Sequence, residues 1–194
     1  MKRIAIAAPA LIVLLASSLM LNSAAPATAQ VVPPNRNAVS FSFAGFSGAP
    51  VYSLGASLIV GRRLDATLGY SFQSVGGVSA SLLSVGVRYH FPVTAPGTDV
   101  FAGVGLASSS ATFSGFGTVN ASGLFVSGGA SIRLAERFTG YVSGSLYSLG
   151  GTSTSVIDLG VQVPLADRAW AQVGYVNFGG SGAPYLGVSL SFPP

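Results

Sequence analysis

The chain has 194 residues, of which 49% are hydrophobic and only 7% are charged, and its mean hydropathy is +0.62. Soluble globular domains carry about 25% charged residues, so this composition excludes an ordinary water-soluble domain and indicates a lipid or fibrous environment. The formal net charge of +4 is too small and too dispersed for a nucleic-acid-binding surface, and the lack of cysteine excludes disulfides and cysteine metal sites.

The N-terminal segment has the features of a secretory signal peptide. Residues 1–3 supply a positive start, residues 4–20 are apolar, and residues 27–29 (Ala-Thr-Ala) form a small-x-small cleavage site. We therefore expect residues 1–29 to be removed and the mature chain, 30–194, to form a single domain. An uncleaved membrane anchor is the alternative for this segment.

Beyond this segment, apolar residues alternate with small or polar ones. No later stretch reaches the roughly 18 to 20 apolar residues that a membrane-spanning helix needs. In residues 80–91 the odd positions from Leu83 to Phe91 are apolar, whereas the even positions carry Ser84, Gly86, Arg88 and His90. A period of two predicts β-strands with one apolar face.

We predict ten such strands, with eight as the alternative count. Their approximate ranges are 38–46, 51–61, 65–73, 80–91, 99–108, 121–133, 137–147, 154–164, 169–178 and 184–192. Every second connection carries charges or proline, and the connections between those are rich in Gly and Ser and carry no charge. A chain that zigzags through a membrane turns on the same side at every second connection. We therefore expect the charged turns and both termini on one side.

The polar faces of these strands favour a membrane protein over a soluble sandwich. A soluble sheet would expose Lys, Glu, Asp and Arg, whereas these faces carry mainly Gly, Ser, Thr and Ala. An antiparallel, up-and-down transmembrane β-barrel accounts for the uncharged polar faces, because its apolar face meets lipid and its small, polar face lines the lumen. Closure of the barrel also satisfies every backbone hydrogen bond, as lipid requires.

Aromatic residues near the strand ends indicate two interfacial girdles. Chance placement in a chain with 10% aromatic residues is the alternative. The set expected near the charged rim is Tyr89, Phe91, Phe138, Trp170 and Phe192, and the set expected near the opposite rim is Phe46, Tyr52, Phe72, Tyr147, Phe178 and Tyr185.

The mature chain resembles small outer-membrane β-barrel proteins of Gram-negative bacteria, in the manner of opacity proteins and the OmpA barrel. The resemblance covers about residues 38–192 and is architectural, apart from the C-terminal strand YLGVSLSF, residues 185–192. That strand is similar to the signal read by the barrel-assembly machinery, although Pro193 and Pro194 follow the terminal aromatic residue. The resemblance implies an outer-membrane location, contact with outer-membrane lipid, and assembly by that machinery.

Charged residues on the lumen face are the candidate functional residues. Asp158 falls in the middle of a strand and must face the lumen, because exposure to lipid would cost several kcal/mol. Arg88 and Arg133 share the lumen face nearer the charged rim. These three residues either set the selectivity of a pore or neutralise one another inside a closed barrel. The chain's only histidine, His90, and Asp99 flank a turn, where solvation is the expected state.

The sequence predicts no catalytic, cofactor or metal site. Residues 108–121 are expected to form the longest loop of the uncharged side, which rests on lipid; folding into the mouth or contact with a partner are the alternatives. Non-catalytic members of the resembled group act as structural barrels, pores or adhesins, and fold alone does not choose among them. We therefore expect a non-enzymatic outer-membrane barrel, structural or forming a small passive channel for small solutes. The alternative is a secreted or surface β-rich adhesin or amyloid-like structural protein.

Overall fold

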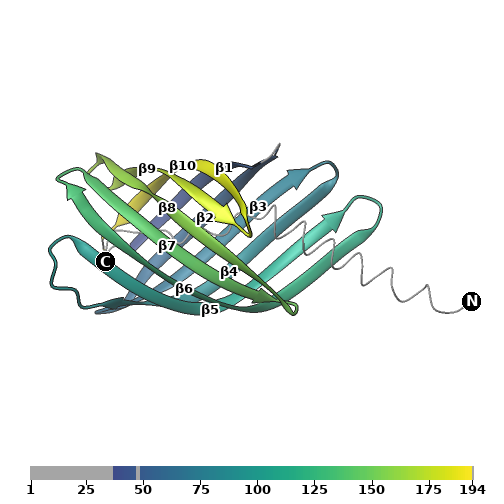
Figure 1. Cartoon of the computed structure of the whole chain (residues 1–194), viewed down its shortest axis with the longest axis horizontal. Coiled ribbons are helices and arrows are strands. Elements are labelled where there is room, and N and C mark those ends of the chain that lie inside the picture. Colours follow the sequence, from purple (N-terminus) through teal and green to yellow (C-terminus); the bar gives the residue numbers. More distant parts are fainter. Residues whose placement is uncertain (1–36, 47–48, 194) are drawn as a thin grey trace, which may run out of the picture.

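The computed structural model describes residues 37–46 and 49–193 (Figure 1). The predicted signal peptide, residues 1–29, lies outside the described residues. Ten antiparallel strands pair with their neighbours in chain order, and β1 pairs with β10 to close a barrel. No helix among the described residues is long and apolar enough to cross a membrane.

The ten-stranded, up-and-down barrel predicted from the sequence is confirmed, and the eight-stranded alternative is wrong. The strands are β1 (Asn37–Phe46), β2 (Ala49–Gly61), β3 (Leu64–Val75), β4 (Val78–Phe91), β5 (Thr98–Phe113), β6 (Gly117–Ala135), β7 (Phe138–Leu149), β8 (Thr152–Ala166), β9 (Ala169–Phe178) and β10 (Ser181–Phe192).

The wall of the barrel is apolar outside and mostly polar inside. Val104 and Leu159 point outward and are 49% and 50% exposed, whereas Asp158 faces the lumen and is 1% exposed. Many of the lumen-facing residues are serines, such as Ser53 and Ser71, whose hydroxyls lie 3.0 Å apart. This distribution of apolar and polar residues is the reverse of that in a soluble protein. It confirms the inward and outward faces that were predicted from the alternation.

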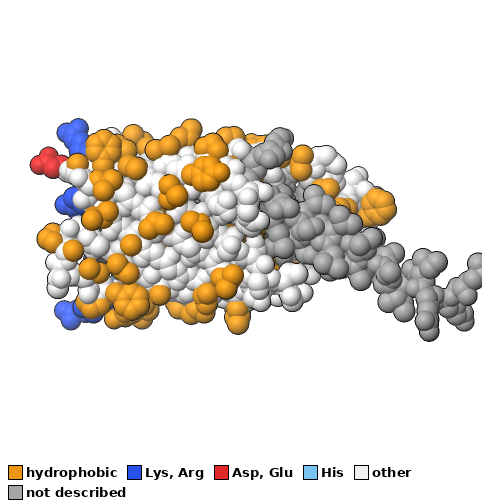
Figure 2. Space-filling view, viewed as in Figure 1, with side chains coloured by type: hydrophobic (Ala, Val, Ile, Leu, Met, Phe, Trp, Pro, Cys, Tyr) orange, Lys and Arg blue, Asp and Glu red, His pale blue; other side chains and the backbone are white. Residues whose placement is uncertain are grey.

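On the face shown in Figure 2, the charged side chains of the described residues lie at one end of the barrel. The exposed pairs Arg62-Arg63, Glu136-Arg137 and Asp167-Arg168 form the β2–β3, β6–β7 and β8–β9 turns. The described turns of the opposite end contain only Gly, Ser and Phe. The alternation of charged and uncharged connections therefore corresponds to the two ends of the barrel.

The two ends also use different turn chemistry. The uncharged turn Gly150-Gly151 has φ angles of 56° and 86°, which a two-residue type I′ hairpin needs and which suit glycine. The charged turns contain no glycine, and each follows a register shift in the preceding strand, centred on Val60, Leu134 or Leu165. A β-bulge increases the local twist, so it replaces the twist that the glycine turns supply elsewhere.

The β5–β6 hairpin is longer than the sequence predicted. Residues 108–121 were expected to form a loop, but β5 continues to Phe113 and β6 begins at Gly117, with paired residues up to the turn. This hairpin projects beyond its neighbours at the uncharged end (Figure 1). The expectation failed because the outward residues are Ser, Thr and Asn, so the apolar period disappears while the strand pairing continues.

Aromatic side chains fill much of the lumen, and part of the girdle prediction is wrong. Tyr52, Phe72, Tyr89, Phe91, Phe138 and Phe192 point outward as expected, at 38% to 47% exposure. Trp170 lies on the lumen face instead, and Tyr147, Phe178 and Tyr185 are buried inside, together with Phe101, Phe125 and Tyr141. The side chain of Phe46 is not among those described.

The inward rings are seated against glycines of neighbouring strands. A Cβ atom built on Gly129 would lie 2.7 Å from the Phe101 ring and 2.7 Å from the carbonyl oxygen of Val142. Gly160 and Gly174 accommodate Tyr141 and Tyr185 in the same way, because an added Cβ would lie 2.9 Å and 2.7 Å from the nearest carbons of the two rings. The lumen glycines therefore provide room for large side chains, and their abundance does not indicate an empty channel.

We expect Gly129→Ala to lower the free energy of unfolding by about 2 kcal/mol, because the added methyl overlaps the ring and a backbone oxygen. Gly128→Ala is the matched control on the outward face, where the nearest atom lies 3.5 Å from the added methyl. Urea unfolding in detergent micelles, followed by the fluorescence of the single tryptophan, Trp170, measures both. Equal midpoints for the two variants would contradict this account of the lumen glycines.

Candidate functional site

An ionic cluster lies on the lumen side near the charged end of the barrel. The Nδ1 atom of His90 lies 2.9 Å and 3.0 Å from the two carboxylate oxygens of Asp99, and its Nε2 atom lies 2.8 Å from Oδ2 of Asp65. His90 therefore joins β3, β4 and β5. The sequence missed this arrangement, because Asp65 was not singled out at the start of its predicted strand, and His90 and Asp99 were expected to be solvated.

The geometry requires two donors on the imidazole ring. A neutral imidazole has one donor and one acceptor nitrogen, whereas an imidazolium donates from both. Because each nitrogen faces a carboxylate, ionised Asp65 and Asp99 pair with the protonated form of His90. Both carboxylates are buried, at 6% and 5% exposure, so the hydrogen bonds are shielded from competing water.

Arg88 completes the cluster from the same strand as His90. It lies directly opposite Asp65 in the β3–β4 ladder, and its guanidinium carbon lies 4.5 Å from the centre of the Phe101 ring. It also attracts the carboxylates of both Asp65 and Asp99 electrostatically. With His90 protonated, two cations face two anions, and the cluster has no net charge.

The register of two hairpins brings these groups together. Asp65 and Asp99 begin the lumen faces of β3 and β5, close to the points where the two strands leave the charged rim. His90 is opposite Phe101 in the β4–β5 ladder, and the amide of His90 donates to the carbonyl of Arg63 in the β2–β3 turn. The turn thus holds the histidine at a fixed height between the carboxylates.

Arg133 does not join the other predicted lumen residues. It is exposed at the charged rim, where its backbone amide donates to the carbonyl of Gly97 at 2.9 Å. The bulge at Leu134 follows it directly and ends the regular register of β6 there. The hypothesis of a constriction shared by Arg88, Arg133 and Asp158 therefore does not match the geometry.

Asp158 lies alone in the middle of the lumen wall. It is opposite Ser143 in the β7–β8 ladder and Val176 in the β8–β9 ladder. Neither of its carboxylate oxygens has a hydrogen-bond partner among the described residues, and the residue is 1% exposed. A buried carboxylate without partners is destabilising in its charged form, so Asp158 is not a structural ion pair.

Other buried polar atoms face the lumen at the β10–β1 closure of the barrel. The hydroxyls of Ser40, Ser57 and Ser189 are buried without a hydrogen-bond partner in the described part of the chain. They lie on the neighbouring strands β1, β2 and β10. Buried polar atoms in protein interiors are normally satisfied by water when no side chain is near, so this part of the lumen wall is hydrophilic.

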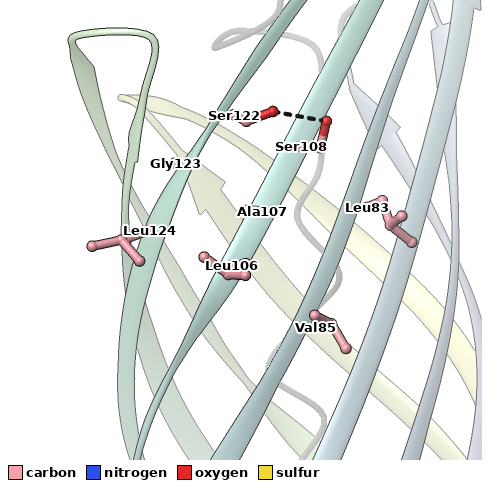
Figure 3. Close-up of a pocket in the computed structure, with 8 residues that line it drawn as sticks. All are labelled: Leu83, Val85, Leu106, Ala107, Ser108, Ser122, Gly123 and Leu124. Carbon is pink, nitrogen blue, oxygen red and sulfur yellow. Dashed lines mark hydrogen bonds between the residues drawn. The ribbon is translucent and has the colours of Figure 1, made fainter.

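Two shallow grooves lie on the outer surface of the wall. One, of about 490 Å³, is bordered by Leu83, Val85, Leu106 and Leu124, and its floor includes Ala107 and Gly123 (Figure 3). At its upper end the hydroxyl of Ser122 donates to that of Ser108 at 3.3 Å. The second groove, of about 450 Å³, lies over Gly55 and Ala56 between the aromatic rings of Phe41 and Tyr70. Both belong to the lipid-facing surface.

Neither lumen site is suited to a multivalent metal ion. Among the residues that the structure describes, no group of three or more His, Cys, Asp or Glu side chains is arranged to hold a metal. The cluster around His90 has its own cations in Arg88 and the imidazolium. Asp158 is a single carboxylate, whereas calcium sites use six to eight oxygen ligands.

Solved structures share the fold. A de novo designed transmembrane β-barrel is 14% identical, with a TM-score of 0.50, and the match covers 82% of this chain and 97% of the design. The outer membrane protease OmpT from Escherichia coli is 7% identical, with a TM-score of 0.53, over 86% of this chain and all of its own (100%). The N-terminal β-barrel domain of OprF from Pseudomonas aeruginosa is 15% identical, with a TM-score of 0.41, over 81% and 98% of the two chains.

No protein-family profile and no curated protein matches the sequence. The matches to the designed barrel and to OmpT, with TM-scores of 0.50 and 0.53, establish the fold, and at these identities they establish nothing about activity. The resemblance to outer-membrane β-barrel proteins that the sequence suggested is thus confirmed in the architecture of the chain.

We expect His90→Ala to lower the free energy of unfolding by about 3 kcal/mol, because it leaves two buried carboxylates with Arg88 as their only cation in the cluster. The double variant His90→Ala, Asp65→Asn removes one of these carboxylates and should recover part of the loss. Urea midpoints in micelles measure both variants. A double variant that is less stable than His90→Ala would contradict the pairing of His90 with Asp65.

Asp158→Asn should change the free energy of unfolding in the opposite direction to a substitution in the His90 cluster. At a pH at which Asp158 is ionised, the substitution removes a buried charge that has no partner, so the free energy of unfolding should rise by about 1 kcal/mol. The matched control is Asp99→Asn, which should lower it because His90 loses a carboxylate partner. A loss of stability in Asp158→Asn equal to that in Asp99→Asn would contradict the isolation of Asp158.

Proposed function

We propose that the protein is a non-enzymatic structural barrel of the bacterial outer membrane whose lumen is a packed core. One observation carries the proposal above all others: the wall is apolar outside, while inside it holds aromatic rings seated on glycines and a neutral ionic cluster. A protein built in this way is stable in lipid without needing an open path through its centre.

The distribution of charge supports an outer-membrane orientation. In barrels of bacterial outer membranes the short turns and both termini face the periplasm. The described chain ends, Asn37 and Pro193, are joined by a hydrogen bond of 3.2 Å, and Asn37 begins β1, which starts at the charged end. The charged turns accordingly face the periplasm in this proposal, and the β5–β6 hairpin faces outward.

The His90 cluster supports a structural role over catalysis. A catalytic histidine needs a free nitrogen that can take a proton from a nucleophile or water. Both ring nitrogens of His90 are instead engaged by carboxylates, at 2.8 Å and 2.9 Å. The cluster is therefore better suited to joining three strands than to acid–base chemistry.

A small passive channel is the second candidate, and Asp158 is the observation that favours it. A carboxylate without a partner, on a lumen wall that also holds the buried hydroxyls of Ser40 and Ser189, would suit a narrow hydrated path for small cations. In this alternative Asp158 and Arg88 are the lumen charges that determine selectivity.

Liposome swelling and planar-bilayer recordings separate the two candidates. The structural role predicts no swelling in isosmotic sugar and no defined conductance for the parent or for Asp158→Ala. Steady conductance that falls or loses cation preference in Asp158→Ala would contradict the structural role and support the channel. Conductance that does not change in the variant would remove Asp158 from the pore.

A further inference from the structure

The β2–β3 turn carries two positive charges and no acid. Two other turns at the charged end, Glu136-Arg137 and Asp167-Arg168, each combine a cation with an acid, whereas Arg62-Arg63 consists of two cations. Both of these arginines are exposed, and in the described part of the chain neither forms an ion pair. The turn therefore presents a doubly positive surface at the rim of the barrel.

The acid that follows the turn in the sequence is directed away from it. Asp65 is buried on the lumen face of β3, and its carboxylate lies 2.8 Å from Nε2 of His90. The amide of His90 donates to the carbonyl of Arg63 at 2.9 Å, which holds the turn against β4. The ionic cluster thus keeps this acid inside the barrel and leaves the charges of Arg62 and Arg63 uncompensated on the outside.

A hollow of about 660 Å³ lies where this turn meets the outer wall. Leu64 and Tyr89 are opposite each other in the β3–β4 ladder and are exposed on the lipid-facing side. The Tyr89 ring packs edge-on against Phe91, with the ring centres 5.2 Å apart. The hollow is lined by Arg62, Arg63, Leu64 and Tyr89. It therefore has a cationic side formed by the turn and an apolar side formed by the wall.

The apolar wall continues from the hollow toward the middle of the barrel. The next outward residue of β3 is Ala66, which lies between Leu58 of β2 and Val87 of β4. Leu58 and Val87 are both exposed. Because alanine is much smaller than these two neighbours, it forms the base of a shallow track between them. The track leads from the hollow into the part of the wall that meets the lipid chains.

We propose that this hollow binds the headgroup of an anionic phospholipid, with the phosphate between Arg62 and Arg63 and an acyl chain along the track over Ala66. Guanidinium groups donate paired hydrogen bonds to phosphate oxygens, so two arginines without an acid suit a phosphate. A phospholipid also carries an apolar chain beside its phosphate. That combination matches the cationic and apolar sides of the hollow, whereas a free phosphate uses only the first.

The charge of the hollow favours an anionic headgroup over a zwitterionic one. The ammonium group of a zwitterionic headgroup requires an acid as its partner, and no acid is among the residues that line the hollow. Arg62 and Arg63 would also repel that ammonium group. Phosphatidylglycerol has a phosphate and no amine, so it leaves no cation without a partner.

Fluorescence quenching by brominated lipids tests the proposal at a single position. Val60 is an exposed residue of β2 that precedes the turn and does not line the hollow. Val60→Trp in a Trp170→Phe chain places the only tryptophan there, since Trp170 is the only native one. The matched control is Phe138→Trp in the same background, because Phe138 is exposed beside the balanced pair Glu136-Arg137.

The measurement compares phosphatidylglycerol and phosphatidylcholine, each brominated near its headgroup and present at the same mole fraction in vesicles. Salt of about 0.15 M screens charge attraction beyond about 8 Å and so suppresses a diffuse layer of anionic lipid. Brominated phosphatidylglycerol should quench Val60→Trp severalfold more than brominated phosphatidylcholine does. Phe138→Trp should be quenched about equally by the two lipids.

Two double variants separate a defined site from the general charge of the rim. Arg62→Gln, Arg63→Gln in the Val60→Trp chain should abolish the preference for phosphatidylglycerol. Arg137→Gln, Arg168→Gln in the same chain removes the same number of positive charges from the same end and should preserve it. Heat-modifiable gel migration shows that each barrel is folded, and all four arginines lie in exposed turns.

Inorganic phosphate, added at constant ionic strength, separates the lipid from a soluble ligand and should leave the preference unchanged. The proposal is overturned if Val60→Trp shows no more preference than Phe138→Trp, if the two double variants lose it equally, or if inorganic phosphate abolishes it. None of these results bears on the structural or channel role of the barrel, since the hollow lies on the outer wall and swelling and conductance report on the lumen.

Discussion

The requirement that backbone groups in lipid be hydrogen-bonded within the protein determines the rest of this structure. Each of the ten strands has a partner on both sides because β1 pairs with β10, and no edge is left open at the level of the apolar band. Once the wall is closed, side-chain alternation places one set of residues in lipid and the other in the lumen. The scarcity of charge in the sequence follows directly, because half of each strand must be compatible with lipid.

The lumen is organised by two different solutions to the same problem of burial. Near the charged end, His90 and Arg88 balance two carboxylates, so four ionisable side chains are buried without net charge. In the rest of the lumen, aromatic rings occupy the space above glycines such as Gly129 and Gly160. Asp158 belongs to neither arrangement, which is why it is the residue on which the structural and channel interpretations differ.

The sequence predicted the features that depend on local periodicity. The ten strands, the inward direction of Asp158 and the outward direction of Leu159 all follow from a period of two. The same period carried a signal that the prediction of girdles overlooked, since Tyr147 shares its face with Ser143 and Ser145. The girdle prediction relied on how close an aromatic residue lies to the end of its strand. Whether the residue shares the inward or the outward positions of the alternation predicted its direction better.

Other features depend on contacts that a single strand does not encode. The pairing of His90 with Asp65 and Asp99 requires the register of two hairpins, and the exposure of Arg133 results from a bulge beside it. β5 and β6 extend beyond their predicted ends because their backbones stay paired there, although the side chains no longer alternate between apolar and polar. The sequence shows each of these residues, but it does not show which residues of other strands lie beside them.

The unequal chemistry of the two rims also bears on how such a barrel enters a bilayer. The glycine turns of the far rim, such as Gly150-Gly151, carry no ionic group, so moving them through hydrocarbon requires no stripping of a charge from water. The arginine-bearing turns would resist the same passage strongly. Insertion with the glycine rim first therefore has the lower free-energy cost. The arginines then keep the folded barrel at the membrane face from which it entered.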